Sequence, residues 1–304
     1  MAIALYTHSD MLGHEPHPRN PERPERLAAV TAALEDSSCD LAWREAPLAS
    51  RADLERVHAP SYLDAVARAA PRDGLVRLDP DTWMSAGSLN GAGRAAGGAI
   101  AAARAVAAGE IQRAFCAVRP PGHHAGPGFA MGFCIYSNIA LAARAAQDAG
   151  LARIAVVDFD VHHGNGTQAA FEVDSSLFFA SVHQSPCYPG TGDPEETGVG
   201  NIVNATSPPG APRAVWRKAF ESLMPRMEAF APDLILISAG FDAHARDPLA
   251  EQSLEAEDFA WATGAIISVA NTSCKGRIVS SLEGGYDLQG LALSAVAHVA
   301  ALDG

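Results

Sequence analysis

The sequence Val156-Val-Asp-Phe-Asp-Val-His-His-Gly-Asn-Gly-Thr167 places carboxylates and imidazoles directly after an apolar run. Such a run predicts a buried strand, and open α/β sheets bind their ligands at the carboxyl ends of such strands. Side chains alternate along an extended backbone, so Asp158, Asp160 and His162 should lie on one side of it. A carboxylate and an imidazole spaced in this way supply half of a divalent-metal site. A strand-end turn with solvated polar residues is the simpler interpretation, but this much buried charge requires a compensating partner.

Length and composition indicate a folded protein with a large apolar core. The chain has 304 residues, of which 48% are hydrophobic and 19% are charged, so disorder is not expected. The formal net charge of −13 argues against a nucleic acid as a partner, because a phosphate backbone requires basic patches on the protein. The acidic charge agrees with a cationic substrate, although it is also an ordinary route to solubility.

The spacing of the cysteines and the first residues of the chain predict the cellular compartment of the protein. The five cysteines are dispersed without a Cys-x-x-Cys pair, which predicts reduced thiols and a cytoplasmic location rather than a disulfide framework. The apolar run at the start, Met-Ala-Ile-Ala-Leu-Tyr, is too short for a signal peptide and indicates a first strand. No window reaches the length that crosses a bilayer, so no membrane partner is expected.

Short apolar strands alternate with Ala-rich helical stretches along the chain. Strands are predicted at Ile3–Tyr6, Ala114–Arg119, Ile154–Asp160, Leu177–Val182, Leu234–Ala239 and Ile278–Leu282. Helices are predicted at Pro24–Leu34, Ser61–Ala69, Ser88–Ala108, Asn138–Ala149, Ala214–Phe230, Ala256–Val269 and from Leu291 onward. This alternation predicts a mainly parallel sheet with helices on both faces. No linker divides the chain, so residues 1–304 are predicted to form one domain whose Pro- and Gly-rich loops carry the site.

Three further loops carry polar side chains at the ends of predicted strands. They are Arg119-Pro-Pro-Gly-His-His124 with two imidazoles, Ser238-Ala-Gly-Phe-Asp242 with a carboxylate, and Glu283-Gly-Gly-Tyr286 with a phenol beside two glycines. Taken singly, these residues have ordinary explanations as capping histidines, a solvated acid and a surface tyrosine. Because all of them follow predicted parallel strands, the four loops together predict one metal-hydrolase site.

Through these motifs the chain resembles the zinc-dependent histone deacetylases and acetylpolyamine amidohydrolases of the arginase–deacetylase superfamily. The resemblance extends over nearly the whole chain. The matching motifs, in the order and spacing of the family, are Asn20-Pro-Glu-Arg-Pro-Glu-Arg-Leu27, Arg119-Pro-Pro-Gly-His-His-Ala125, Gly132-Phe-Cys134, Asp158-Phe-Asp-Val-His-His-Gly-Asn165, Tyr188-Pro-Gly-Thr-Gly192, Ala239-Gly-Phe-Asp242 and Glu283-Gly-Gly-Tyr286. Asn165 and the Glu-Gly-Gly-Tyr form resemble the class II branch. The implied fold is a three-layer α/β/α domain with an eight-stranded, mainly parallel sheet.

By this resemblance, Asp160, His162 and Asp242 would bind a catalytic zinc ion. Two carboxylates and one imidazole leave coordination positions open for a water and a carbonyl oxygen, as a catalytic zinc requires. Zinc acidifies the water and polarises the amide. The implied activity is the hydrolytic removal of an acetyl or related acyl group from a lysine-type amine.

The resemblance also implies roles for the other polar residues. His124 would be the general base and then the acid that protonates the leaving amine. His123 beside Asp158 would act electrostatically, because the carboxylate favours the imidazolium form. Asn165 would orient His124 without adding charge. Tyr286 would donate its hydroxyl to the developing oxyanion, with the adjacent glycines supplying mobility.

Structural potassium and a substrate tunnel are further features that the family implies. The first potassium site would use Asp158, Asp160, His162, Ser181 and Val182, largely through carbonyl oxygens. The second would use Phe171, Asp174, Leu177 and Asn201. The substrate-binding residues would be Gly132, Phe133, Tyr188, Leu249 and Gly284. Phe133 and Tyr188 would flank an extended acyl-lysine chain, and a tyrosine where many relatives carry Phe predicts a more polar rim.

The rim residues depart from the family pattern. Asn20 stands where many relatives have His, although His17 lies close by. Leu249 takes the place of a gatekeeping Glu in a polyamine-selective relative, which disfavours polyamines here. Asp79 and Asp81 either cap the helix that follows or contact a peptide backbone or a cationic tail.

Other functions compete with the deacylase interpretation. An acetylpolyamine deacetylase would differ from an acyl-lysine deacylase in the charge of its rim. A catalytically idle acyl-lysine-binding protein is disfavoured by Tyr286, because such a protein has no use for an oxyanion donor. An arginase-like ureohydrolase would need further Asp ligands for two manganese ions, and His163-Gly164-Asn165 supplies none. The sequence leaves a homo-oligomer open.

Overall fold

The computed structural model describes residues 2–304, and an eight-stranded parallel sheet runs through its centre. The strands, in spatial order, are β2 (Leu41–Glu45), β1 (Ile3–Thr7), β5 (Arg113–Cys116), β10 (Ile278–Leu282), β9 (Leu234–Ala239), β6 (Ile154–Asp158), β7 (Leu177–Gln184) and β8 (Ile202–Ser207). Every neighbouring pair in this sheet is parallel. All six strands predicted from apolar runs are present.

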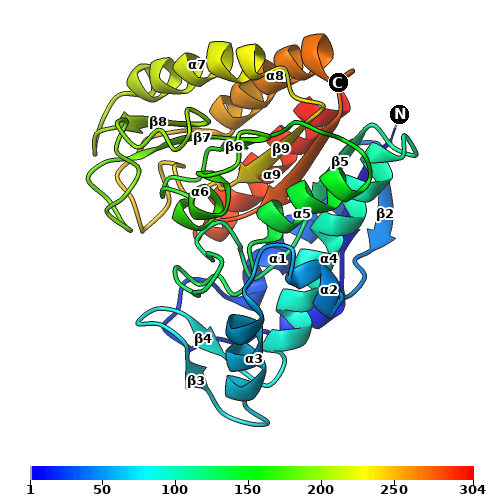
Figure 1. Cartoon of the computed structure of the whole chain (residues 1–304). Coiled ribbons are helices and arrows are strands. Elements are labelled where there is room, and N and C mark those ends of the chain that lie inside the picture. Colours follow the sequence, from blue (N-terminus) through cyan, green and yellow to red (C-terminus); the bar gives the residue numbers. More distant parts are fainter. Residues whose placement is uncertain (1) are drawn as a thin grey trace.

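Helices cover both faces of the sheet. One layer consists of α1 (Pro24–Glu35), α7 (Arg213–Phe230), α8 (Ala256–Ser273) and α9 (Leu288–Asp303). The opposite layer consists chiefly of α4 (Ser88–Ala107) and α5 (Asn138–Asp148), which pack against each other. Figure 1 shows α7 and α8 on one side of the sheet and α4 and α5 on the other. The predicted three-layer α/β/α arrangement is therefore confirmed. None of the helices within residues 2–304 combines the length and apolar composition that crossing a bilayer requires.

Short elements fill the connections between the layers. They are the 3₁₀ helix η1 (Ser9–Gly13), α2 (Arg51–Leu54), α3 (Pro60–Ala69), α6 (Asn165–Phe171) and an antiparallel hairpin of β3 (Val76–Arg77) and β4 (Trp83–Met84). The hairpin and α3 project from one end of the molecule (Figure 1). The turn of this hairpin contains Asp79 and Asp81, so neither residue caps the following helix α4.

The two strands that apolar runs did not predict, β2 and β8, are the outer strands of the sheet. The β2 sequence Leu-Ala-Trp-Arg-Glu is only partly buried, and Trp43 is 41% exposed. In β8, Asn204 and Thr206 interrupt the apolar residues. An edge strand has a paired neighbour on one side only, so its sequence does not need the continuous apolar run of an inner strand.

Two inner strands end earlier than the sequence predicted. Strand β6 ends at Asp158 rather than Asp160, and β5 ends at Cys116 rather than Arg119. Beyond β6 the side chains nevertheless continue to alternate between apolar and polar surroundings, because Phe159 and Val161 are fully buried in the apolar core. The residues that follow both strands leave the hydrogen-bonded ladder and form the loops of the site described next.

Candidate active site

Four neighbouring strands in the middle of the sheet, β5, β10, β9 and β6, end at the same edge. The loops after them carry the polar residues predicted from the sequence: His123 and His124 after β5, Tyr286 after β10, Asp242 after β9, and Asp160 and His162 after β6. Because parallel neighbours direct their carboxyl ends the same way, residues distant in the sequence converge at this edge.

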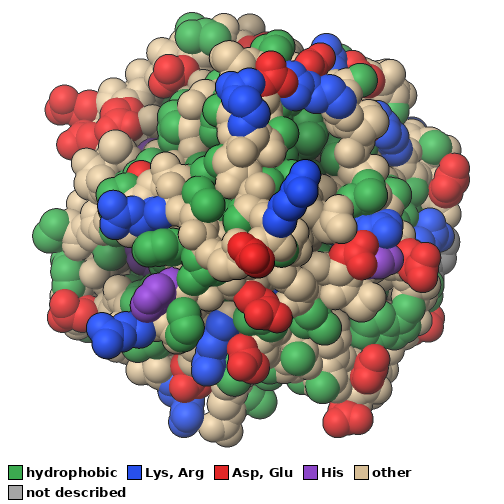
Figure 2. Space-filling model, turned by 90° about the horizontal axis from the view of Figure 1, so that it is seen from below, with side chains coloured by type: hydrophobic (Ala, Val, Ile, Leu, Met, Phe, Trp, Pro, Cys, Tyr) green, Lys and Arg blue, Asp and Glu red, His purple; other side chains and the backbone are tan. Residues whose placement is uncertain are grey.

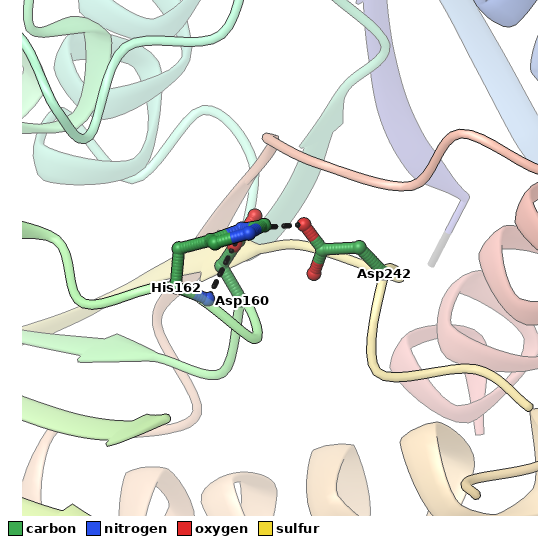
Figure 3. Close-up of side chains that lie close together, drawn as sticks. All are labelled: Asp160, His162 and Asp242. Atoms are coloured by element: carbon green, nitrogen blue, oxygen red, sulfur yellow. Dashed lines mark hydrogen bonds and ion pairs between the residues drawn. The ribbon is translucent and has the colours of Figure 1, made fainter. Parts of the chain in front are cut away.

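Asp160, His162 and Asp242 form a compact, buried group whose ligand-type atoms all lie within 4.8 Å of one another. His162 Nδ1 is 3.1 Å from Oδ1 of Asp160 and 3.1 Å from Oδ2 of Asp242. Figure 3 shows the imidazole lying between the two carboxylates. Burial and the nearby Asp160 carboxylate raise the pKa of Asp242 to about 7. Burial lowers the pKa of His162, but its contacts with both carboxylates outweigh this and raise that pKa well above its usual value.

Two glycines allow the carboxylates to approach this closely. A side chain at Gly240 would overlap the Asp160 carboxylate, and one at Gly284 would overlap the carboxylates of both Asp242 and Asp160. The Gly284 N–H donates to Oδ2 of Asp160 at 2.8 Å. Gly284 therefore fits against the acidic group, and its neighbour Gly285 adopts a positive φ, of 115°.

The adjacent imidazoles of His123 and His124 have different partners. His123 Nδ1 is 2.9 Å from Oδ2 of Asp158, whereas His124 Nδ1 is 2.7 Å from Oδ1 of Asn165. Burial lowers the pKa of His123, but the Asp160 and Asp158 carboxylates outweigh it and raise that pKa to about 10. Burial and the charges of His123 and His162 hold the pKa of His124 well below its usual value. The pair thus comprises one charged and one neutral imidazole near pH 7.

Three fully buried charged residues, to which the sequence pattern gave no role, support the histidine loop. Arg119 donates to both carboxylate oxygens of Glu22 at 2.8 Å each. Glu283 accepts the backbone N–H groups of Gly122 at 2.6 Å and His123 at 3.1 Å through Oε2. All three lie inside motifs quoted above. The sequence does not show, however, that Glu22 and Glu283 contact the loop that begins at Arg119.

A narrow cavity of about 190 Å³ leads to this group. Its lining residues are Asp81, His124, Gly132, Phe133, His162, Tyr188, Leu249 and Tyr286. The Phe133 and Tyr286 rings meet edge to face at 5.7 Å, and the His124 and Tyr188 rings at 5.2 Å. Gly132 also makes room for the His124 ring, because a side chain there would overlap that imidazole.

Loops far apart in the sequence form the mouth of the cavity. Asp81 Oδ1 accepts the Gly132 N–H at 2.9 Å, and the Asp81 carbonyl oxygen accepts the side-chain N–H of Asn20 at 3.2 Å. Burial and the neighbouring Asp81 raise the pKa of Asp79 to about 6. The hairpin turn and the first loop, whose roles were open from the sequence, therefore both contribute to the rim.

The residues expected to bind potassium also lie together. Asp158 in β6 pairs in register with Ser181 in β7, beside Val182. In the second group, the side-chain amide nitrogen of Asn201 is 2.9, 3.1 and 2.7 Å from the carbonyl oxygens of Phe171, Asp174 and Leu177. Three carbonyl oxygens converge on this one amide group, which has only two N–H donors.

A scan against protein-family models matches the histone deacetylase domain over residues 20–302. The chain belongs to the histone deacetylase family. Relatives of this deacetylase-family chain include a "probable deacetylase" of Archaeoglobus fulgidus, 38% identical over 95% of this chain and 83% of that protein. A "histone deacetylase-like amidohydrolase" of Pseudomonas aeruginosa is 40% identical over 89% of this chain and 72% of that protein.

A solved structure supports the same family assignment. The crystal structure of the HDA15 HD domain superposes with a TM-score of 0.94, at 34% sequence identity, over 99% of this chain and 88% of that one. The predicted resemblance and fold are thereby confirmed. Family membership supports hydrolase chemistry of the deacetylase type, and the buried Asp–His–Asp group agrees with the general metal dependence of the family.

Proposed function

We propose that this chain is a zinc-dependent amidohydrolase that removes acetyl or related acyl groups from lysine-type amines. The observation that carries the proposal is that a buried Asp–His–Asp group able to hold a metal ion lies beside His123, His124 and the buried phenol of Tyr286, at the end of one cavity. Relatives named as deacetylases and as an amidohydrolase support the reaction class.

The proposed zinc ligands are Asp160, His162 and Asp242, and their chemistry and spacing fit that ion. Tetrahedral ligands about 2.0–2.1 Å from zinc lie about 3.3 Å apart, close to the 3.1 Å separations between His162 Nδ1 and the two carboxylates. A dication would also offset the two buried negative charges, which otherwise raise the pKa of Asp242 through burial and the nearby Asp160 carboxylate. When bound, zinc supplies an acidified water and a polarised amide carbonyl.

His124 is the proposed proton carrier. Asn165 Oδ1 accepts the Nδ1–H of His124, which leaves Nε2 with a free lone pair. The lowered pKa of His124 keeps the ring neutral, so it can accept a proton from the attacking water and return it to the departing amine. His123, held as an imidazolium by Asp158, supplies a fixed positive charge at the same site.

Tyr286 is the proposed oxyanion donor. The Tyr286 side chain is buried and lines the cavity. Burial raises the pKa of its hydroxyl well above the usual value, so the phenol stays protonated. A protonated phenol can donate a hydrogen bond to the carbonyl oxygen as negative charge develops on it.

We further propose two structural potassium ions. Asp158, Asp160, His162, Ser181 and Val182 would bind the first, largely through carbonyl oxygens. Phe171, Asp174, Leu177 and Asn201 would bind the second. Three carbonyl oxygens converge there on the Asn201 side-chain NH₂ group. An NH₂ group cannot ligate a cation, so it would have to move aside and Asn201 would bind through an oxygen. Carbonyl oxygen suits a cation of low charge density. The melting temperature in potassium chloride should exceed that in tetramethylammonium chloride at equal ionic strength, and equal values would count against both sites.

An acyl-lysine substrate fits the rim better than an acetylpolyamine. Leu249 presents an apolar side chain at the cavity, where a second ammonium group would need a carboxylate. Figure 2 shows charged and apolar side chains interspersed over one face of the molecule. The polyamine alternative rests on Asp79 and Asp81. A deacylation screen of acyl-lysine peptides against acetylpolyamines with added zinc tests the proposal, and inactivity toward every acylated amine would refute it. We also assign a cytoplasmic location, on the dispersed cysteines.

A further inference from the structure

Asp247 is a buried carboxylate beside the cavity for which neither the family motifs nor the proposed mechanism has a role. It lies in the loop after β9 and is 9% exposed. Its two oxygens accept from two different segments. Oδ2 accepts the backbone N–H of Tyr286 at 2.6 Å, and Oδ1 accepts the backbone N–H of Leu249 at 3.0 Å. Both of these residues line the substrate cavity.

The Tyr286 backbone needs such an anchor because of what precedes and follows it. Before it comes Gly285, whose φ of 115° is accessible to few residues other than glycine. After it comes Asp287, whose side chain caps helix α9 by accepting the Gly290 N–H at 2.8 Å. Nε of Arg26 donates to the Gly285 carbonyl oxygen at 2.6 Å, and the contact with Asp247 holds the next residue, at the junction between this glycine and helix α9.

We propose that Asp247 is a positioning residue that aims the Tyr286 hydroxyl and fixes the cavity wall at Leu249 at the same time. This inference rests on the proposed role of Tyr286 as the oxyanion donor. Through the Asp247 carboxylate, the segment at Leu249, which would contact the substrate chain, is linked by hydrogen bonds to the segment at Tyr286, which would contact the reacting carbonyl. An error of about 1 Å in the placement of a catalytic group can cost on the order of 100-fold in rate.

The arrangement requires a carboxylate rather than an amide. Asparagine has one accepting oxygen and one donating NH₂ group, so at this position it would place an N–H donor against a backbone N–H. Asp247→Asn thus breaks one of the two contacts while changing the size of the side chain very little. Arg246→Ala is the matched control, because Arg246 is in the same loop and pairs with Asp287 at 2.9 Å but does not contact Tyr286.

The test is steady-state kinetics of the zinc-loaded full chain with an acyl-lysine peptide, together with the zinc content and melting temperature of each variant. Asp247→Asn should lower kcat by about 10- to 100-fold, leave KM within about threefold and retain zinc. Arg246→Ala should keep kcat within about twofold of the wild type. A near-normal kcat in Asp247→Asn, or a loss of activity that follows a loss of zinc, would overturn the proposal.

A double-mutant cycle with Tyr286→Phe separates this inference from the function on which it rests. If Asp247 acts through the Tyr286 hydroxyl, then Asp247→Asn should cost less than about threefold in the Tyr286→Phe background. Equal costs in both backgrounds would overturn the positioning role. A near-normal kcat in Tyr286→Phe alone would instead contradict the proposed oxyanion donor. If Asp247→Asn does not fold, Asp247→Ser can replace it, because serine removes the carboxylate without placing an NH₂ group against a backbone N–H. The same double-mutant cycle with Tyr286→Phe then applies.

Discussion

At the floor of the cavity, Asp160 and Asp242 are almost completely buried, whereas at its mouth Tyr188 and Leu249 are 39% and 38% exposed. The floor residues follow directly from inner strands of the sheet, and backbone N–H groups hold both carboxylates: Gly284 donates to Asp160 and Val161 to Asp242. The rim comes from long loops and a small hairpin. Chemistry should therefore depend steeply on single floor residues, while the rim should tune which substrate is used.

Removing a metal ligand should have the largest effect. Asp242→Ala deletes one of the three proposed ligands, so zinc affinity should fall by on the order of 100-fold or more and activity should be lost with it. Metal analysis of the purified variant after dialysis measures this directly. Asp73→Ala, at an exposed acidic residue, is the control and should retain zinc. Full zinc retention in Asp242→Ala would show that the ligand assignment is wrong.

The two imidazoles offer the next test, because they are neighbours with separate partners. His124→Ala should lower kcat by about 100- to 10,000-fold, since it removes the proposed proton carrier. His123→Ala should be less damaging, because it removes a fixed charge that tunes the site. Both variants should be measured across a pH series. Equal residual activities at every pH would contradict the separate roles.

Tyr286→Phe should lower kcat by about 100-fold or more with little change in KM, because the proposed hydrogen bond from its hydroxyl to the oxyanion would be made mainly in the transition state. Tyr188→Phe is the matched control, since it removes a hydroxyl from the same cavity at the rim. That variant should affect KM more than kcat. If both substitutions reduced kcat equally, the contrast between floor and rim would fail.

Substrate preference should show the smallest effect. The wild type should prefer acyl-lysine peptides to acetylpolyamines, and Leu249→Glu should shift the ratio of kcat/KM toward polyamines by roughly tenfold or more, since pairing an ammonium with a carboxylate is worth about 1–3 kcal/mol. The assays require moderate salt, because the charge of −13 attracts polycations at low ionic strength. A wild-type polyamine preference above about tenfold that disappears in Asp81→Asn would reverse this assignment.

The same contrast between floor and rim limits what the sequence could predict. The inner strands are continuous apolar runs followed by charged residues, so β6 with Asp160 and His162, and β9 with Asp242, were predictable. The outer strands β2 and β8 were not, because partial burial leaves no apolar run to detect. Family resemblance supplied the count of eight strands.

Contacts between distant loops were also beyond sequence reasoning. Glu283 lies within a motif quoted from the sequence, but no sequence pattern shows that Glu283 and Asp247 accept hydrogen bonds from backbone N–H groups of other loops. Gly164 is a similar case, since a side chain there would overlap the Asp158 carboxylate. Such requirements for space appear only when the loops are packed together.

The position of β10 in the sheet has a consequence for how the protein gains its activity. Within residues 2–304, β10 is the last strand along the chain, yet it lies between β5 and β9. Until it inserts, the strands β2, β1 and β5 share no edge with β9, β6, β7 and β8. The Asp–His–Asp group belongs to the second set, and the paired imidazoles belong to the first. In a partly folded chain that lacks this central strand, the proposed metal ligands would stay apart from the paired imidazoles, and we expect such a chain to be inactive.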